Sequence, residues 1–136
     1  MTTGPAGEEI HTDEHGRVVA QFLWDRQGKH DEHSGCWMRT SQVPTGGSML
    51  LPRVGWEVAV RYAEGDVDQP VVVERLYNGL TPPPYSLPAN AARSSLQTAT
   101  TPGGGSSNEL RMSDVAGEEQ MFLNASYDMS VNVGNN

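Results

Sequence analysis

The last part of the chain alternates apolar and polar side chains. Between Met121 and Val133 the apolar residues occupy one parity and the polar residues the other, with Phe122 as the one large exception, and neither Gly nor Pro interrupts the pattern. A period of two indicates a β-strand with one apolar face. We therefore predict extended chain over 121–133, longer than the usual strand of about five or six residues.

A single long strand with an apolar row needs a partner to cover that row. We expect further copies of the chain to supply it, so that the tails wind round one another into an oligomeric β-rod. Five apolar side chains are expected to face the axis of this rod: Met121, Leu123, Met129, Val131 and Val133.

The region 9–78 predicts a small all-β domain. Short runs with β-type alternation are separated by polar or Gly-containing turns, and long helical patterns are missing. Five strands at this spacing suggest a small closed barrel of the OB type. The expected strands are Arg17–Trp24, Cys36–Gln42, Met49–Leu51, Gly55–Tyr62 and Val71–Tyr77.

The flanking segments carry no such pattern. Residues 1–8 are expected to be disordered, and residues 79–107 are rich in Pro, Gly and Ser without a hydrophobic period, which predicts a linker. Residues 108–136 then form the start of the rod: 109–112 as a short strand, 114–117 as a turn and the alternating tail. The predicted fold is thus an all-β barrel, a linker and a rod segment.

Composition narrows the function classes. The formal net charge is −8, with 9 Lys and Arg against 17 Asp and Glu, which opposes binding to nucleic acid or anionic membranes. The single Cys36 excludes a disulfide within the chain and is interpreted as a buried, inert thiol. No apolar run reaches the ~20 residues of a membrane span, and the first residues do not resemble a signal peptide. Export, if it occurs, uses a route that reads no such signal.

Candidate chemistry is sparse. One cluster of possible metal ligands is His30, Asp31, Glu32 and His33. The cluster lies in a polar loop that has no helical or strand periodicity to direct these side chains at one point, so a solvated loop is favoured over a metal site. A glycosidase needs two carboxylates across a cleft. The candidates for that role share one Gly and Pro loop and are interpreted as turn-capping residues: Glu64, Asp66 and Asp68.

The glycine runs are not phosphate-binding loops. Neither Gly46–Gly47 nor Gly103–Gly105 is followed by the Lys that such a loop requires. We expect no catalytic residue, no metal and no cofactor.

A series of short motifs covers nearly the whole chain from Glu9 onward. In order, they are Glu9–Val18, Phe22–Arg26, Ser34–Gln42, Pro52–Val58, Glu64–Asp66, Asp68–Pro70, Tyr77–Asn78, Pro83–Tyr85, Leu87–Asn90, Asn108–Arg111 and Gly117–Gln120. In this order and spacing they resemble the OB-domain region of VgrG proteins, the trimeric spikes of type VI secretion systems, which are related to the puncturing device of contractile phage tails.

This resemblance implies a non-enzymatic structural role. Three chains would place their barrels around an axis, and the tails would form a three-sided β-prism that closes strand edges between chains. The family's spike sits on a tube of stacked rings, is driven out by sheath contraction, crosses the target envelope and carries tip or effector proteins. Assembly in the cytoplasm and delivery outside without a signal peptide follow from it. The residues expected in the barrel core, or between sister barrels, are Trp24, Trp37, Trp56, Val58, Val60 and Val72.

Two departures from the family pattern stand out. VgrG proteins usually carry a large N-terminal base domain and a longer β-helix, so this chain is interpreted either as an excised spike segment or as a naturally short relative. Leu23 replaces the His that the family often has there. Trimerisation unaided and trimerisation only within a longer spike both stay open.

The competing hypothesis is a free OB module that binds oligosaccharide or single-stranded nucleic acid. Exposed aromatic side chains can stack on sugars or bases in such domains. The candidates are Trp24, Trp37, Trp56 and Tyr62. The residues next to these aromatic side chains are mostly apolar, which favours packing in the core. The negative net charge of the chain opposes binding to nucleic acid.

Overall fold

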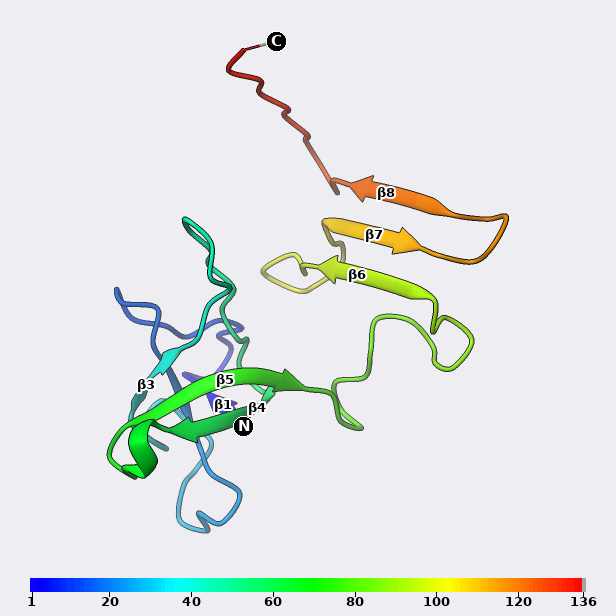
Figure 1. The fold of residues 1–136 in the computed structure, drawn as a ribbon. Helices are drawn as coiled ribbons and strands as arrows, with labels where there is room; N and C mark the ends of the chain where they lie inside the picture. Colours follow the sequence, from blue (N-terminus) through cyan, green and yellow to red (C-terminus); the bar gives the residue numbers. More distant parts are fainter. Residues whose placement is uncertain (136) are drawn as a thin grey trace. The chain divides into compact units, whose positions relative to one another are not determined.

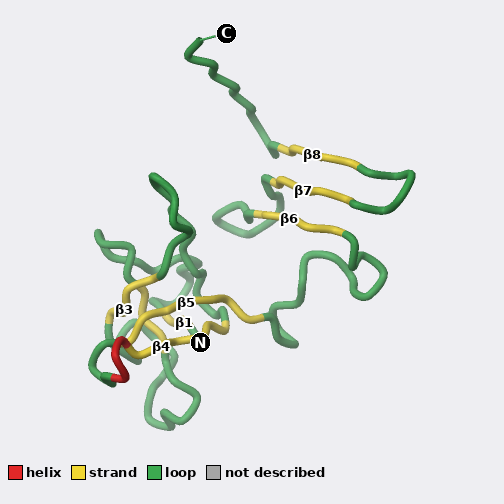
Figure 2. The backbone as a smooth tube through the Cα atoms, viewed as in Figure 1, coloured by secondary structure: helices red, strands yellow, loops and turns green. Residues whose placement is uncertain are grey.

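The computed structural model describes residues 1–135 and divides the chain into two compact units, Met1–Pro82 and the part from Pro83 on. Both units are built from β-strands joined by loops, with one short 3₁₀ helix, η1 (Ala63–Gly65), in the first unit (Figures 1 and 2). The all-β prediction is confirmed for the described residues.

The first unit holds a curled five-stranded sheet. Its strand order is β1-β2-β3-β5-β4, antiparallel throughout except for the parallel pair β3 and β5. The strands are β1 (Thr2–Thr3), β2 (Val18–Ala20), β3 (Trp37–Thr40), β4 (Glu57–Tyr62) and β5 (Pro70–Leu76).

Backbone hydrogen bonds link the two edges of this sheet. The Thr2 amide donates to the Trp56 carbonyl at 2.8 Å, and the Gly55 amide donates to the Thr2 carbonyl at 2.9 Å. Gly55 and Trp56 immediately precede β4, the last strand in the order, while Thr2 belongs to β1, the first. The sheet thus curls towards a barrel, as expected of an OB domain.

The prediction that residues 1–8 are disordered is wrong for the first three. Thr2 and Thr3 are almost fully buried and pair with Ala20 and Val19 of β2. The Thr2 hydroxyl also contacts the Arg53 and Trp56 carbonyls. Two residues are too few to show a period, so this strand leaves no pattern in the sequence.

The expected strand Met49–Leu51 does not form. The Gln42 side chain takes both backbone groups of Leu50: its amide nitrogen donates to the Leu50 carbonyl at 3.1 Å, and its oxygen accepts from the Leu50 amide at 2.8 Å. These are the groups that a neighbouring strand would use. A side-chain amide therefore replaces the strand pairing, and Met49 is left 81% exposed.

A small cluster of apolar side chains forms the core of the first unit. Val18, Ala20, Met38 and Val72 are buried, with Met38 at 0% exposure. Partly buried side chains pack against this cluster, and these are Phe22, Val58 and Val60. Val72 thus lies in the core, and Val58 and Val60 line it.

The three tryptophans lie elsewhere. Trp24 is 71% exposed and Trp37 40% exposed, so the prediction that they are core residues of one barrel is wrong. Trp56 is half-buried beneath the guanidinium of Arg75, 3.7 Å from its ring centroid. The buried cluster contains no indole, and packing of the tryptophan rings against a sister barrel stays a prediction.

The second unit is a three-stranded antiparallel sheet, β6-β7-β8 (Figure 1). Its strands are β6 (Arg93–Gln97), β7 (Glu109–Ser113) and β8 (Gln120–Asn124). β6 lies inside the predicted linker 79–107, so the prediction that this segment contains no element is wrong. A single apolar residue, Leu96, gives β6 no period, and pairing along the whole length of β7 supplies its order.

The tail is not one uninterrupted strand. β8 ends at Asn124, which pairs with Glu109, the first residue of β7, so the partner strand ends at that position. The Asn108 side chain then accepts from the Ser126 amide at 2.9 Å. After Asn124 the chain continues outside the sheet (Figure 1).

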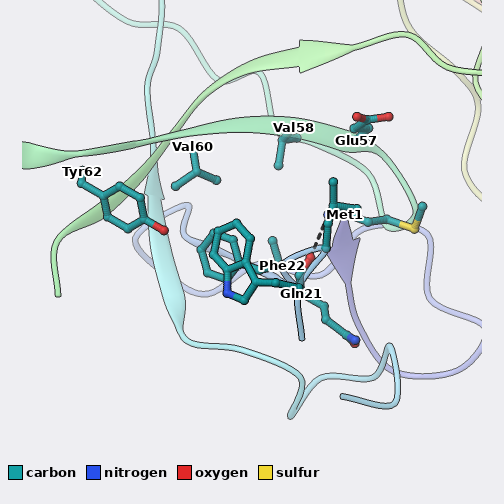
Figure 3. A pocket seen from close by; sticks show the side chains of 10 residues that line it. Met1, Gln21, Phe22, Glu57, Val58, Val60 and Tyr62 are labelled. Atoms are coloured by element: carbon teal, nitrogen blue, oxygen red, sulfur yellow. Dashed lines mark hydrogen bonds between the residues drawn. The ribbon is translucent and has the colours of Figure 1, made fainter. Parts of the chain in front are cut away.

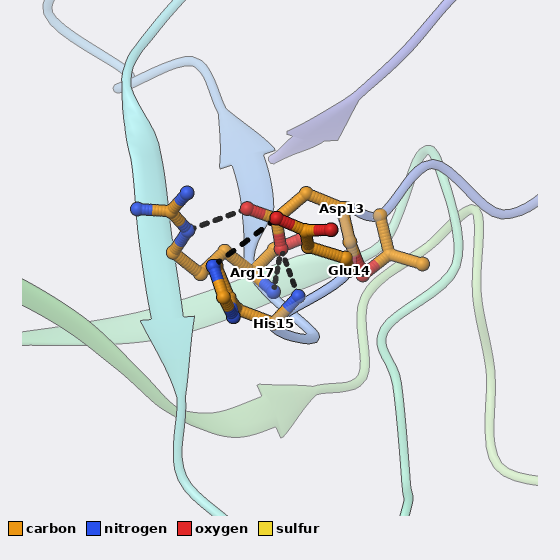
Figure 4. A network of polar contacts seen from close by, with 5 residues as sticks. Asp13, Glu14, His15 and Arg17 are labelled. Atoms are coloured by element: carbon orange, nitrogen blue, oxygen red, sulfur yellow. Dashed lines mark hydrogen bonds and ion pairs between the residues drawn. The ribbon is translucent and has the colours of Figure 1, made fainter.

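A charged turn precedes β2 (Figure 4). The Asp13 carboxylate accepts from the backbone amides of His15 and Arg17 and from the Arg17 guanidinium. Partial desolvation acts to raise the pKa of Asp13, but these hydrogen bonds outweigh it and lower the pKa below its ordinary value. The turn therefore fixes the Arg17 side chain at the start of β2.

We predict that Met38→Ala destabilises the first unit by about 2–5 kcal/mol, because it opens a cavity under a fully buried side chain. Chemical denaturation followed by tryptophan fluorescence measures this change. Leu23→Ala, at an 85% exposed position, is the matched control and is expected to shift the free energy of unfolding by less than about 0.5 kcal/mol. Equal effects of the two changes would contradict this core assignment.

We predict that Asp13→Asn destabilises the chain at neutral pH and that the difference from wild type shrinks in acid. A carboxyl whose pKa is lowered by folding stabilises the fold above its ordinary pKa of about 3.9 and loses that contribution as the pH falls through its folded value. Urea denaturation between neutral pH and pH ~2.5 tests this, with Glu14→Gln as control. A difference that is constant with pH would refute the role of the Asp13 charge.

Candidate functional site

The second sheet has one apolar face. In its register Leu96 pairs with Leu110 and Leu110 with Leu123, while Met112 pairs with Met121. Paired residues share a face of a sheet, so these side chains lie together. We call them the apolar face: Leu96, Leu110, Met112, Met121 and Leu123, each at least 38% exposed in the single chain.

The opposite face is covered from within the chain. The Tyr85 hydroxyl donates to the Glu109 carboxylate, and the Arg111 guanidinium donates to the Tyr85 hydroxyl at 3.0 Å. Arg111 also lies 4.3 Å above the centroid of Phe122, its cross-strand neighbour. Glu109 is buried beneath this cluster. The sheet therefore has one face satisfied by its own side chains and one face open to a partner.

Neighbouring side chains stabilise the positive charge of Arg111. The hydrogen bond with Tyr85 and the nearby Glu109, 3.8 Å away, both raise the pKa of the Arg111 guanidinium. A second guanidinium nitrogen donates to the Gln120 side chain at 3.1 Å. Since Gln120 begins β8 and Arg111 belongs to β7, this contact ties the two strands on the covered face.

The tail continues the apolar parity beyond the sheet. Met129, Val131 and Val133 are between 52% and 79% exposed, as are the sheet residues Met121 and Leu123 at 75% and 60%. All five residues predicted for the rod axis are therefore uncovered in one chain. Contiguous exposed apolar side chains on this scale mark an association surface. Their position on a rod axis stays a prediction.

Sequence reasoning missed three of the five residues of the apolar face. Leu110 and Met112 alternate over β7 and could have been paired with the tail, because the turn 114–117 was expected. Leu96 offered no signal, since it is the single large apolar residue of β6. Its place on the apolar face follows from pairing with β7 alone.

The first unit has a small apolar pocket of about 180 Å³ near the end of β2 (Figure 3). Val58, Val60 and Tyr62 of β4 form one wall. Phe22 stacks on the Trp24 indole with ring centroids 4.6 Å apart and lies 6.5 Å from the Tyr62 ring. The pocket is thus lined mainly by aromatic and aliphatic side chains.

The loop that contains His30–His33, which was predicted to be solvated, is stabilised by hydrogen bonds between its own residues. Asp31 accepts from the Ser34 hydroxyl at 2.9 Å and from the His33 amide at 3.0 Å, and the hydrogen bond with Ser34 lowers the pKa of Asp31. Over residues 1–135 no three His, Cys, Asp or Glu side chains are grouped so as to hold a metal ion. The Asp31 carboxylate is used within the loop.

The acidic loop before β5 is also internally bonded. Asp66 accepts from the Asp68 amide at 2.9 Å and from the Gln69 side chain at 3.0 Å, which is the arrangement of a capped turn.

Cys36 is exposed, so its interpretation as a buried thiol is wrong. It lies one residue before β3, where solvent reaches the side chain. Within the described part, no helix is long and apolar enough to cross a membrane.

Comparison with known proteins identifies both parts of the chain. Residues 8–77 match the family described as type VI secretion system/phage-baseplate injector OB domain, and residues 94–136 match the bacteriophage T4 gp5 C-terminal trimerisation domain. The second match covers β7, β8 and all of β6 except its first residue, Arg93.

Three relatives show the same relationship at the sequence level. The type VI secretion system spike proteins VgrG4b and VgrG5 of Pseudomonas aeruginosa are each 47% identical over 98% of this chain and 17% of their own length. The actin cross-linking toxin VgrG1 of Vibrio cholerae is 46% identical over 92% of this chain and 12% of its own length. The chain thus spans less than a fifth of the length of these relatives. It belongs to the type VI secretion system and phage-baseplate injector OB-domain family, and resembles VgrG spike proteins along nearly all of its length.

Proposed function

We propose that the chain is the barrel and first rod segment of a trimeric VgrG-type spike in a contractile injection apparatus. The observation that carries this proposal is the apolar face of the second sheet, which is open in one chain while the opposite face is closed by the Tyr85, Glu109 and Arg111 cluster. The match of residues 94–136 to a trimerisation domain supports a homotrimer as the occupant.

The energetics favour association through this face. Each large aliphatic side chain contributes up to about 1.5–3 kcal/mol when it moves from water into an apolar contact. The apolar face and the tail together offer Leu96, Leu110, Met112, Met121 and Leu123, followed by Met129, Val131 and Val133. Three copies around an axis cover all of these side chains and bring the free backbone groups of the sheet edges within reach of a neighbour.

A spike of this kind needs no chemistry of its own. Sheath contraction supplies the work of crossing the target envelope and the rod transmits it, so the rod must be stiff along its axis. In this proposal the base of the spike sits on tube-ring proteins, and the rod end carries tip or effector proteins. One relative bears the name of a toxin, which supports effector carriage by related spikes. In this proposal the spike assembles in the cytoplasm and is delivered into the target cell.

We predict that Val131→Asp weakens trimer formation. Three equivalent carboxylates would meet near the axis in an apolar environment, at a cost of several kcal/mol. Asn132→Asp adds the same charge at the other parity and is expected to leave assembly unchanged. Light-scattering mass and thermal melting of the full chain measure both variants. Wild-type mass and melting in Val131→Asp would contradict the axial position of this residue.

We predict that removal of residues 108–136 abolishes association and leaves a folded first unit. The deletion removes β7, β8 and the tail, and with them most of the apolar face. Light scattering should give the mass of one chain for the shortened protein and a larger mass for the full chain at the same concentration. A full chain with the mass of one copy, or a shortened chain that keeps the larger mass, would contradict the proposal.

A further inference from the structure

A second, polar groove of about 400 Å³ lies on the first unit, away from the core cluster. It is lined by Arg17, Trp37, Arg39 and the segment Asp68–Pro70. Its volume is within the range of ~300–1,000 Å³ that is usual for small-molecule sites. Trp37, predicted for the core or for a contact between sister barrels, is 40% exposed here, and the other lining side chains have no assigned role in the proposed spike.

The pairing of β2 with β3 determines where the basic and aromatic side chains of the groove lie. Val18 pairs with Met38 and Val19 with Trp37, so Arg17 comes opposite Arg39 in the antiparallel register of β2 and β3. Trp37 and Arg39 lie on the face opposite the buried Met38, because side chains alternate along a strand. His11 packs against the Trp37 ring with centroids 4.9 Å apart, while 40% of Trp37 stays exposed.

The charged groups of the groove are not equivalent. The Arg17 guanidinium is neutralised by Asp13. The Arg39 guanidinium and the Asp68 carboxylate line the same groove, and neither has a hydrogen bond or ion pair with another residue of the described chain. A strong donor and a strong acceptor therefore face one space, beside a partly exposed indole.

This combination selects the kind of ligand. An anionic ligand would meet the Asp68 carboxylate, and a cationic ligand would meet the Arg39 guanidinium, so either is opposed by one half of the groove. A neutral, polyhydroxylated ring avoids both penalties. Its hydroxyl groups donate to Asp68 and accept from Arg39, and hydrogen bonds to charged partners are the stronger ones. Its apolar ring face covers the indole, which supplies a rigid contact surface.

We propose that this groove binds a hexopyranose unit of a neutral oligosaccharide, with Trp37 as the stacking platform and Asp68 and Arg39 as hydrogen-bonding groups for the hydroxyls. The OB architecture is compatible with this role, since other domains of this fold class bind oligosaccharides. The site lies wholly within the first unit and does not depend on the association of the tails, so it goes beyond the proposed spike function.

The test is a titration of the full ¹⁵N-labelled chain with maltotetraose, cellotetraose and chitotetraose. The Trp37 indole N–H resonance, assigned with Trp37→Phe, reports occupancy of the groove. At least one tetrasaccharide is expected to shift this resonance saturably. Isothermal titration calorimetry with the same sugar then compares the variants, because Trp37→Ala removes the reporter resonance; Trp37→Ala and Asp68→Asn should each weaken binding by about tenfold or more. Asp68→Asn is nearly isosteric at an exposed position, so it tests the groove without disturbing packing.

Trp24→Ala is the matched control, because Trp24 is an exposed indole outside the groove, and its affinity should equal that of wild type. The absence of a saturable shift with all three sugars would overturn the proposal, as would binding that survives both groove variants. Saturable binding of tetraglutamate in place of the sugars would also overturn it and would assign the groove to acidic peptides.

Discussion

The constraint on which the second unit depends is the difference between the two faces of one three-stranded sheet. Tyr85, Glu109 and Arg111 close one face with hydrogen bonds made inside the chain. The other face presents Leu110 and Leu123 to solvent. With this face in water, the sheet lacks the free energy that burial of its apolar side chains would supply. The closed face therefore does more than satisfy polar groups, since it fixes which side of the sheet a partner must cover.

How much of this could be read from the sequence depends on whether an element carries its own period. The tail from Met121 shows its strand character and its apolar parity directly, and both are found in β8. The end of β8 at Asn124 was not predictable in the same way, because it is set by where β7 begins and by a side chain, Asn108, that is distant in sequence. Periodicity reports which face is apolar, while the partner decides how long the strand is.

The errors in the first unit have related causes. Met49–Leu51 has the composition of a strand, but Gln42 takes the backbone groups that pairing would use. Thr2–Thr3 has too few residues to show a pattern and still forms an edge strand linked to Trp56. Large aromatic residues are usually assigned to a core, yet here four smaller side chains fill it. The indoles are placed instead by neighbours that no local pattern reveals, such as Arg75 above Trp56.

Both proposed contacts of this chain rest on this division of side chains. Association through aliphatic side chains is non-directional and needs only complementary shape, which suits a rod under axial load. Recognition of a small polar ligand needs donors, acceptors and a flat apolar surface. In the proposed groove these are Arg39 and Trp37 of β3 and Asp68 of the loop before β5. Because Met38, between Trp37 and Arg39, points into the core, the same strand anchors the barrel and holds these two groove residues in position. The buried methionine and the exposed arginine are thus alternate faces of one structural element, and neither role restricts the other.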